Sequence, residues 1–209
     1  MDTESIIFLA FVICLMSGAF GFAFWFNWNQ THQTYLQFQK IAKKFGLKLT
    51  VEKKKDRLPK LSTLTGQYKD YSVVMSFYKE GYERSTRIYT YVEFEVENPG
   101  QKSFTIARED LVGKVAKAFG ASDMDIGDPG FDKIFIIKTN DVTYINKILT
   151  EKIRKDMLYA ASQTRVCSFS LEGKYLRFTV MDFMIKDKVR ILFERMVGTL
   201  HEVAEGMRR

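Results

Sequence analysis

The chain has 209 residues, of which 46% are apolar and 27% charged, and its formal net charge is +7. This length is enough for a membrane anchor and one soluble domain that buries a core without covalent cross-links. The sequence has two cysteines, Cys14 and Cys167, separated by most of the chain. This excludes a disulfide framework, and the cysteine usage fits a reducing cytoplasm.

An apolar run from Ile6 to Trp28 contains no Asp, Glu, Lys or Arg. As a helix it extends roughly 34 Å, enough to cross a hydrocarbon core of about 30 Å. A cleaved signal peptide would begin with basic residues and end at a small-residue cleavage site, whereas Met1 to Ser5 carries acids and no base. The sequence therefore predicts a retained transmembrane helix over 6–28 after a leader over 1–5.

The flanks of this helix predict its orientation. The leader has no basic side chain, whereas four lysines follow the helix within about 20 residues, and basic residues favour the cytoplasmic side. Aromatic rings cluster from Phe24 to Trp28, as expected at the headgroup layer. We expect the leader outside and the C-terminal domain in the cytoplasm.

Small residues recur within the helix at steps of four, a spacing that lets a second helix approach closely. The alternative is that small residues are simply common in membrane helices. If pairing occurs, the partner is a second copy of the chain or another membrane subunit. The helix-packing candidates are Ala10, Cys14, Ser17, Gly18 and Gly21.

The positive charge is concentrated between Lys40 and Lys60, where nine basic residues face two acids, an excess equal to the whole net charge. A nucleic-acid-binding protein more often carries basic residues across its folded domain, so we expect no nucleic acid partner. Two readings stay open: the segment contacts anionic lipid headgroups, or it only sets topology and solubility. The lipid-contact candidates are Lys40, Lys43, Lys44, Lys48, Lys53, Lys54, Lys55 and Arg57.

The first half of the soluble part predicts mainly strands. Apolar residues at steps of three and four predict a helix over 30–45, ended by Gly46, and a connector or short strand follows over 47–60. Alternating β-branched and aromatic residues predict strands over 64–68, 71–78, 86–97 and 103–107, with a turn at 98–100. A short helix is predicted over 109–119.

The second half predicts a strand over 131–138, an amphipathic helix over 141–162 capped by Asn140 or Asp141, and a hairpin of strands over 164–171 and 174–181. A final helix is predicted over 186–207. Hairpin-paired strands with helices between and after them indicate an α+β domain on an antiparallel sheet. The predicted organisation is a leader (1–5), a transmembrane helix (6–28), a juxtamembrane helix with a basic connector (29–60), and a cytoplasmic α+β domain (61–209).

Catalytic and metal-binding patterns are missing from the sequence. His201 and Glu202 lack the second histidine of the H-E-x-x-H zinc pattern, and there are no phosphate-binding glycine loops and no nucleophile elbow. The acidic loop over 123–132 fails the EF-hand spacing, so we interpret it as a turn rather than a cation site. We interpret Cys167 as a buried residue within a strand. We expect no cofactor.

The segment Gly127-Asp128-Pro129-Gly130-Phe131-Asp132-Lys133-Ile134-Phe135, followed by a helix, a hairpin and a C-terminal helix, resembles a family of bacterial membrane-anchored proteins with a "GD..FD..F" segment. That family has no assigned activity, so the resemblance implies a bacterial inner-membrane protein and no site residues.

Together these features favour a non-enzymatic accessory or scaffold protein that presents a cytoplasmic surface to membrane or cytoplasmic proteins, for example as a small subunit of a larger membrane complex. The alternative is an anionic-lipid- or ligand-sensing domain that uses the basic segment. An enzyme built on acids of the 123–132 loop is the third hypothesis.

Overall fold

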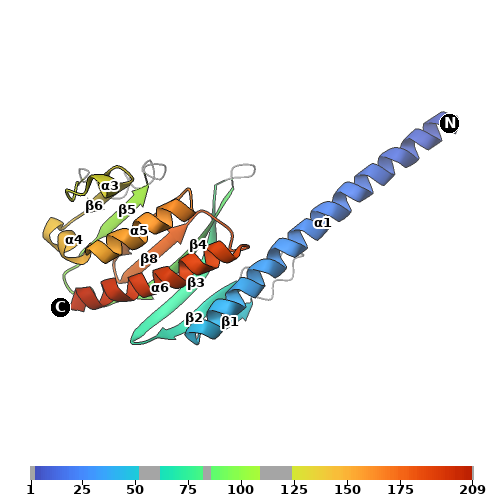
Figure 1. Ribbon diagram of the computed structural model, residues 1–209. Helices are drawn as coiled ribbons and strands as arrows, with labels where there is room; N and C mark the ends of the chain where they lie inside the picture. The colour runs from blue at the N-terminus through green and yellow to red at the C-terminus, as the bar shows by residue number, and fades with distance from the viewer. Residues whose placement is uncertain (1–2, 52–61, 82–85, 109–123, 209) are drawn as a thin grey trace.

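A computed structural model describes residues 3–51, 62–81, 86–108 and 124–208 (Figure 1). Its most prominent element is helix α1 (Thr3–Phe45), which is continuous for 43 residues. The predicted transmembrane helix and the predicted juxtamembrane helix are therefore one rod, which ends at Gly46 with φ +67°. Its described apolar side chains between Ile6 and Trp28 are exposed, apart from the partly exposed Val12, and this stretch is long and apolar enough to cross a membrane.

In the described residues, eight strands form one sheet in the order β1-β2-β3-β4-β8-β7-β5-β6, and every neighbouring pair is antiparallel. The predicted α+β class is thus confirmed. The strands of the first half are β1 (Lys48–Val51), β2 (Ser62–Tyr68), β3 (Tyr71–Glu80), β4 (Arg87–Glu95) and β5 (Phe104–Arg108). The helix predicted over 109–119 lies outside the described residues.

The strand predicted over 131–138 was wrong in its first half. Pro129–Asp132 forms a short helix, α3, and strand β6 begins only at Phe135 and ends at Thr139. Asp128 is the reason, because its carboxylate caps the helix by accepting hydrogen bonds from the backbone of Gly130 and Phe131. Pro129 occupies the first turn, where a missing N–H costs nothing.

The single helix predicted over 141–162 is instead two helices, α4 (Val142–Ile148) and α5 (Glu151–Gln163). Asp141 caps α4, as predicted, whereas the chain leaves helical geometry at Leu149. Thr150 then caps α5 by accepting a hydrogen bond from the backbone of Ile153. Apolar periodicity continues across this break, so a pattern of buried positions cannot reveal it.

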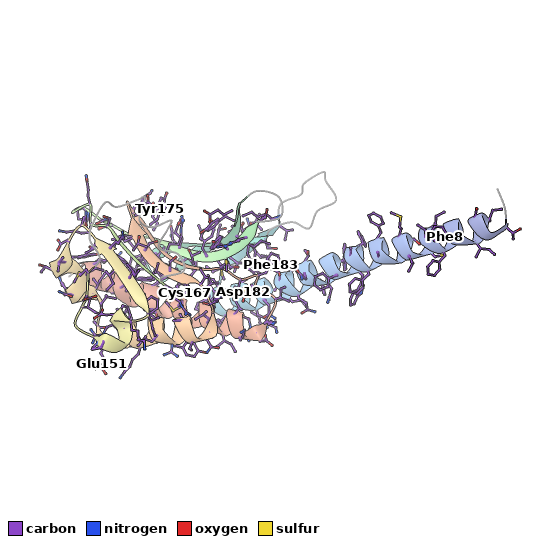
Figure 2. All side chains as sticks on the ribbon, turned by 90° about the horizontal axis from the view of Figure 1, so that it is seen from above. Phe8, Glu151, Cys167, Tyr175, Asp182 and Phe183 are labelled. Atoms are coloured by element: carbon purple, nitrogen blue, oxygen red, sulfur yellow. The ribbon has the colours of Figure 1, made fainter. Side chains whose placement is uncertain are left out.

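The hairpin β7 (Cys167–Glu172) and β8 (Tyr175–Val180) and the final helix α6 (Asp187–Arg208) agree with prediction. The described helices of the domain contribute to one core cluster on one face of the sheet, as Figure 2 shows from above. Five of the buried residues of α6 form an apolar stripe along the helix: Val189, Leu192, Met196, Leu200 and Val203.

The last turns of α1 are part of this core. Phe38 and Ile41 are almost completely buried, and the ring of Phe38 stacks on that of Phe77 in β3 at 4.8 Å. The ring of Phe45, seven residues further, meets the edge of Tyr68 in β2 at 5.3 Å. The domain is therefore joined to α1 by packing and not by a flexible linker.

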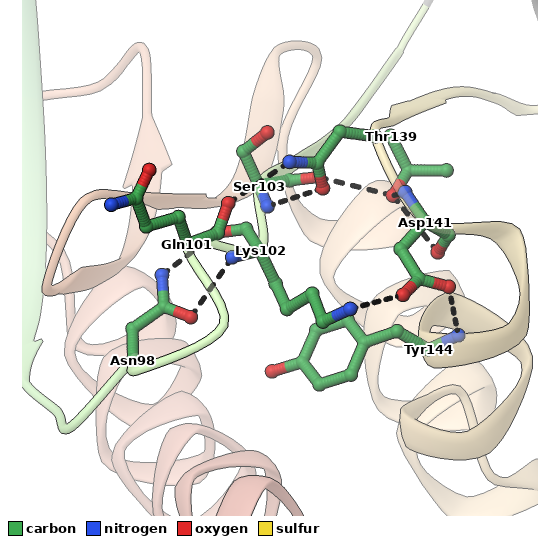
Figure 3. Close-up of polar contacts among 8 residues, drawn as sticks. Asn98, Gln101, Lys102, Ser103, Thr139, Asp141 and Tyr144 are labelled. Atoms are coloured by element: carbon green, nitrogen blue, oxygen red, sulfur yellow. Dashed lines mark hydrogen bonds and ion pairs between the residues drawn. The ribbon is translucent and has the colours of Figure 1, made fainter.

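The opposite end of the sheet, away from the apolar part of α1, is held by asparagine amides (Figure 3). Asn98 bonds the backbone N–H and C=O of Lys102 and the carbonyl of Gly173. Asn140 similarly bonds the backbone of Ser103 and Gln101. These amides satisfy backbone groups that strand pairing leaves unpaired.

Candidate docking face and membrane anchor

The face of the sheet opposite the described helices is polar and rich in hydroxyl groups and tyrosines. Strand alternation explains which residues lie on this face, because the residues that precede and follow each core position point away from the helices. We call this surface the open face; its central residues come from five strands and are Thr65, Ser76, Tyr78, Tyr89, Tyr91, Glu93, Tyr175, Arg177, Thr179, Ser168 and Ser170.

A cluster of tyrosines lies on strands β3 and β4 of the open face. Tyr78 and Tyr89 are register partners whose rings stack at 4.9 Å, and the ring of Tyr91 lies 6.0 Å from that of Tyr78. Tyr89 is buried, whereas Tyr78 is 37% exposed. Burial, aided by the neighbouring Tyr89, raises the pKa of Tyr78 to about 12, and burial also raises that of Tyr91. Both phenols are therefore protonated at neutral pH and can donate hydrogen bonds.

Charges on the open face are paired. Arg177 in β8 forms an ion pair with its register partner Glu93 in β4, and its guanidinium lies over the ring of Tyr91 at 5.0 Å. Lys174 pairs with Glu95 at 2.6 Å near the end of the same strands. Because these charges are paired, strands β4 and β8 have no excess of positive charge that could bind the phosphate backbone of a nucleic acid. Many protein-binding surfaces are rich in tyrosine, serine and arginine and contain little lysine, as this face does.

The tyrosines and the phenylalanine of β4 serve as cross-strand pairs and core. Phe94 lies in the core on the helix side, whereas Tyr89 and Tyr91 point to the open face. Because they point to opposite sides, these three rings do not form one base-stacking platform. The contributions of Tyr78, Tyr175 and Arg177 were missed; only the alternation of their strands, combined with strand order, reveals that they share a face.

The predicted lipid-contact lysines divide into three sets. Lys40 and Lys44 are half-exposed and pair with Asp187 (3.4 Å) and Glu194 (2.6 Å) of α6. Lys43 and Lys48 are exposed, and the first lines a shallow groove of about 700 Å³ between α1 and β1. The other four, Lys53, Lys54, Lys55 and Arg57, lie outside the described residues. Lipid contact by these residues stays a prediction.

The helix-packing candidates lie along α1, and the side chains described there, those of Cys14 and Ser17, are exposed. Ser17 donates hydrogen bonds back to the carbonyls of Ile13 and Cys14, which satisfies its hydroxyl inside an apolar environment. A Cβ added to Gly18 or Gly21 would meet nothing within 4 Å in this single chain. Pairing through this surface also stays a prediction.

The described residues of the acidic loop over 123–132 and the buried Cys167 both have structural roles. Asp132 accepts hydrogen bonds from the backbone of Ile126 and Asp128, so its carboxylate closes the turn. Within the described residues, no group of three or more His, Cys, Asp or Glu is arranged to hold a metal ion. Cys167 is buried, as predicted, and burial raises the pKa of its thiol to about 11, which keeps it protonated.

His201 is largely enclosed, since its side chain is only 15% exposed. Its ring meets the edges of Tyr68 and Tyr71, each at 5.8 Å between centroids. Burial, and secondarily the charge of Lys69, lowers the pKa of His201. The folded protein therefore holds fewer protons at this site than the unfolded chain does between the two pKa values.

We expect this histidine to make the domain less stable in mild acid. Its contribution is fully present above the unfolded pKa of about 6.5 and is lost as pH falls towards the lowered folded pKa. Denaturant unfolding of the full chain in detergent, followed from neutral to mildly acidic pH, should show a smaller decrease for His201→Gln than for the wild type. Identical pH slopes for the two proteins would contradict this assignment.

Comparisons with known proteins show a shared fold only. No family model matches the sequence, and no curated protein matches it. Among solved structures, the chain is similar to the crystal structure of the mycobacterial trehalose monomycolate transport factor A, TtfA, with a TM-score of 0.50 and 7% sequence identity. The similarity covers 86% of this chain and 94% of that chain.

Proposed function

We propose that this protein is a membrane-anchored, non-enzymatic accessory subunit that holds a partner protein against the open face, beside the cytoplasmic leaflet of a bacterial inner membrane. One observation carries the proposal: the helix that provides the apolar span ends inside the core of the domain. Among the described side chains of α1, the first buried one is Thr34, which follows Trp28 by six positions, or roughly 9 Å of helix.

A rigid connection of this kind matters for a scaffold. An enzyme acting on a soluble substrate needs no fixed angle to the bilayer, and a flexible linker would serve it equally well. Here Phe38 and Ile41 lock the helix to the sheet, so the open face keeps a constant height and direction relative to the membrane. A membrane partner that meets this face binds a preorganised surface and loses less conformational entropy.

The occupant proposed for the open face is a protein. The ion pairs of Arg177 and Lys174 neutralise the charge that a nucleic acid would require. The exposed tyrosines offer large ring surfaces with a donor at the tip, which suits contact with another polypeptide. The similarity to a transport factor supports an accessory role beside a membrane protein, although that likeness is one of fold.

Site-specific photo-crosslinking in native membranes tests the proposal. A benzophenone side chain replaces Tyr78 or Tyr175, which are 37% and 41% exposed on the open face. The control is the same probe at Ile191, which is 46% exposed on helix α6. We expect one adduct of defined mass, identified by mass spectrometry, from both open-face positions and none from Ile191.

A second variant ties the adduct to the face. Arg177→Glu places a second carboxylate directly opposite that of Glu93. This variant should reduce the adduct severalfold while the amount of the protein in the membrane is unchanged. Equal adducts from the open face and from Ile191, or an adduct indifferent to Arg177→Glu, would overturn the proposal.

A further inference from the structure

The packing of α1 determines which end of the sheet faces the membrane. Phe45 packs beside Tyr68 at one end of the β2–β3 hairpin, and Phe38 packs beside Phe77 six residues further along β3 than Tyr71. Moving along β3 from Tyr71 to Phe77 therefore follows α1 back towards its apolar span. Strand β3 therefore runs towards the side on which the N-terminal, apolar part of α1 extends, as Figure 1 also shows.

Segments far apart in the sequence meet at this membrane-facing end. Strand β3 ends at Glu80, whose register partner is Arg87 at the start of β4. The loop from β8 to α6 lies beside them, because Thr90 donates a hydrogen bond to the carbonyl of Asp182 at 2.6 Å and Phe183 stacks on Phe77. Helix α6 begins at Asp187, which pairs with Lys40 of α1.

This end carries four basic side chains, from strands β3 and β4 and from the start of α6 with the residue before it: Lys79, Arg87, Lys186 and Lys188. All four are exposed. Within the described part of the chain none of the four forms an ion pair; Lys188 donates to the carbonyl of Gln163 at 3.5 Å. Of the nearby acids, Glu80 lies opposite Arg87 in the strand register, Asp187 is paired with Lys40 and Arg190, and Asp182 accepts the backbone N–H of Phe183.

We propose that these four residues form a headgroup-binding edge. This edge contacts the anionic lipids of the leaflet beside which α1 places the domain. The inference uses α1 as a membrane span, as the proposed function does, but needs no partner protein. It uses residues outside the basic segment 40–60 of the sequence, which only the fold brings to one end.

Physical arguments support a bilayer as the occupant. Each Lys or Arg held near an anionic membrane surface contributes about 1 kcal/mol of attraction, within a Debye length of about 8 Å at physiological ionic strength. Because α1 already confines the domain to the surface, no translational entropy is lost when the edge meets the headgroups. The attraction would therefore fix the tilt of the domain and the direction of its open face.

The test uses the full chain in vesicles, with a fluorophore attached at Thr86→Cys in a Cys14→Ser background. Cys167 stays unlabelled because it is buried. Quenching by headgroup-spin-labelled lipid is compared between phosphatidylcholine vesicles and vesicles that also contain phosphatidylglycerol. We expect the anionic lipid to increase quenching about twofold or more at low salt, and added salt to reverse this.

Two charge-matched variants decide the result. Neutralising the edge should remove at least about half of the anionic-lipid-dependent quenching, because all four proposed contacts are lost. Neutralising four lysines away from this end should leave it unchanged. The edge variant carries Gln at Lys79, Arg87, Lys186 and Lys188, and the control carries Gln at Lys69, Lys147, Lys155 and Lys174.

Three outcomes would overturn the inference: quenching independent of phosphatidylglycerol, equal loss in both variants, or no loss in the edge variant. Flotation of the same vesicles reports anchoring separately. A protein that floats but shows no lipid-dependent quenching refutes the edge and leaves the anchored scaffold intact, whereas a protein that fails to float refutes the anchor on which both depend.

Discussion

Phe38→Ala is expected to lower the free energy of unfolding of the domain by about 3–5 kcal/mol, because it removes a fully buried aromatic ring and leaves a cavity. Phe38 lies where α1 enters the core and stacks on Phe77 at 4.8 Å, so the loss falls on the junction between helix and sheet. The same substitution should loosen the fixed angle between the span and the domain.

Denaturant unfolding of the full chain in detergent micelles measures this loss. Ile191→Ala, at an exposed position of α6, is the matched control and should change stability by less than about 0.5 kcal/mol. If Phe38→Ala behaves like the control, the last turns of α1 do not dock on the sheet in solution, and the rigid anchor of the proposed function is wrong.

Asp156→Ala is expected to lower the free energy of unfolding by about 2–4 kcal/mol, because it removes the acceptor for two buried or half-buried donors. The Asp156 carboxylate is 8% exposed and accepts hydrogen bonds from Arg195 at 2.6 Å and Thr199 at 2.8 Å. These contacts join α5 to α6, and the guanidinium of Arg195 also lies over the ring of Tyr159 at 4.3 Å.

The comparison with exposed pairs makes this prediction specific. Glu151 and Lys155 form an ion pair on the wet face of α5 with side chains about 70% exposed, so Glu151→Ala should cost less than about 1 kcal/mol. Asp156→Asn, which keeps the shape and one acceptor oxygen, should fall between the two. Equal stability of Asp156→Ala and Glu151→Ala would show that the α5–α6 contact is not held by this carboxylate.

Local patterns in the sequence were sufficient for most elements. Strand alternation around Tyr71 and Arg87, the hairpin turn at Gly173 and the apolar stripe of α6 each follow from periods that a single segment displays. Predictions from these patterns failed where a helix cap interrupts the hydrophobic periodicity, at Asp128 and at Thr150. A cap acts through one side chain and its neighbours' N–H groups, so the hydrophobic pattern does not register it.

The open face and the headgroup-binding edge illustrate what a sequence pattern does not contain. Alternation in β4 shows that Tyr91 and Phe94 point to opposite sides, but not which side the helices cover. Strand order β3-β4-β8 brings Tyr78, Tyr91 and Arg177 together, and its β4–β8 step is set by pairings between residues 80 to 90 positions apart.

By itself, the sequence determined the candidate membrane span, the α+β class and the concentration of charge after the span, because hydrophobicity, periodicity and charge are properties of each residue and its near neighbours. Only the tertiary structure decided that the anchor helix enters the core and that Lys79 and Lys186 meet at one end. It also decided that Tyr78 and Arg177 share the face opposite the described helices. Those relations depend on long-range strand pairing and helix packing, which are selected by the burial of the whole core rather than by any one segment.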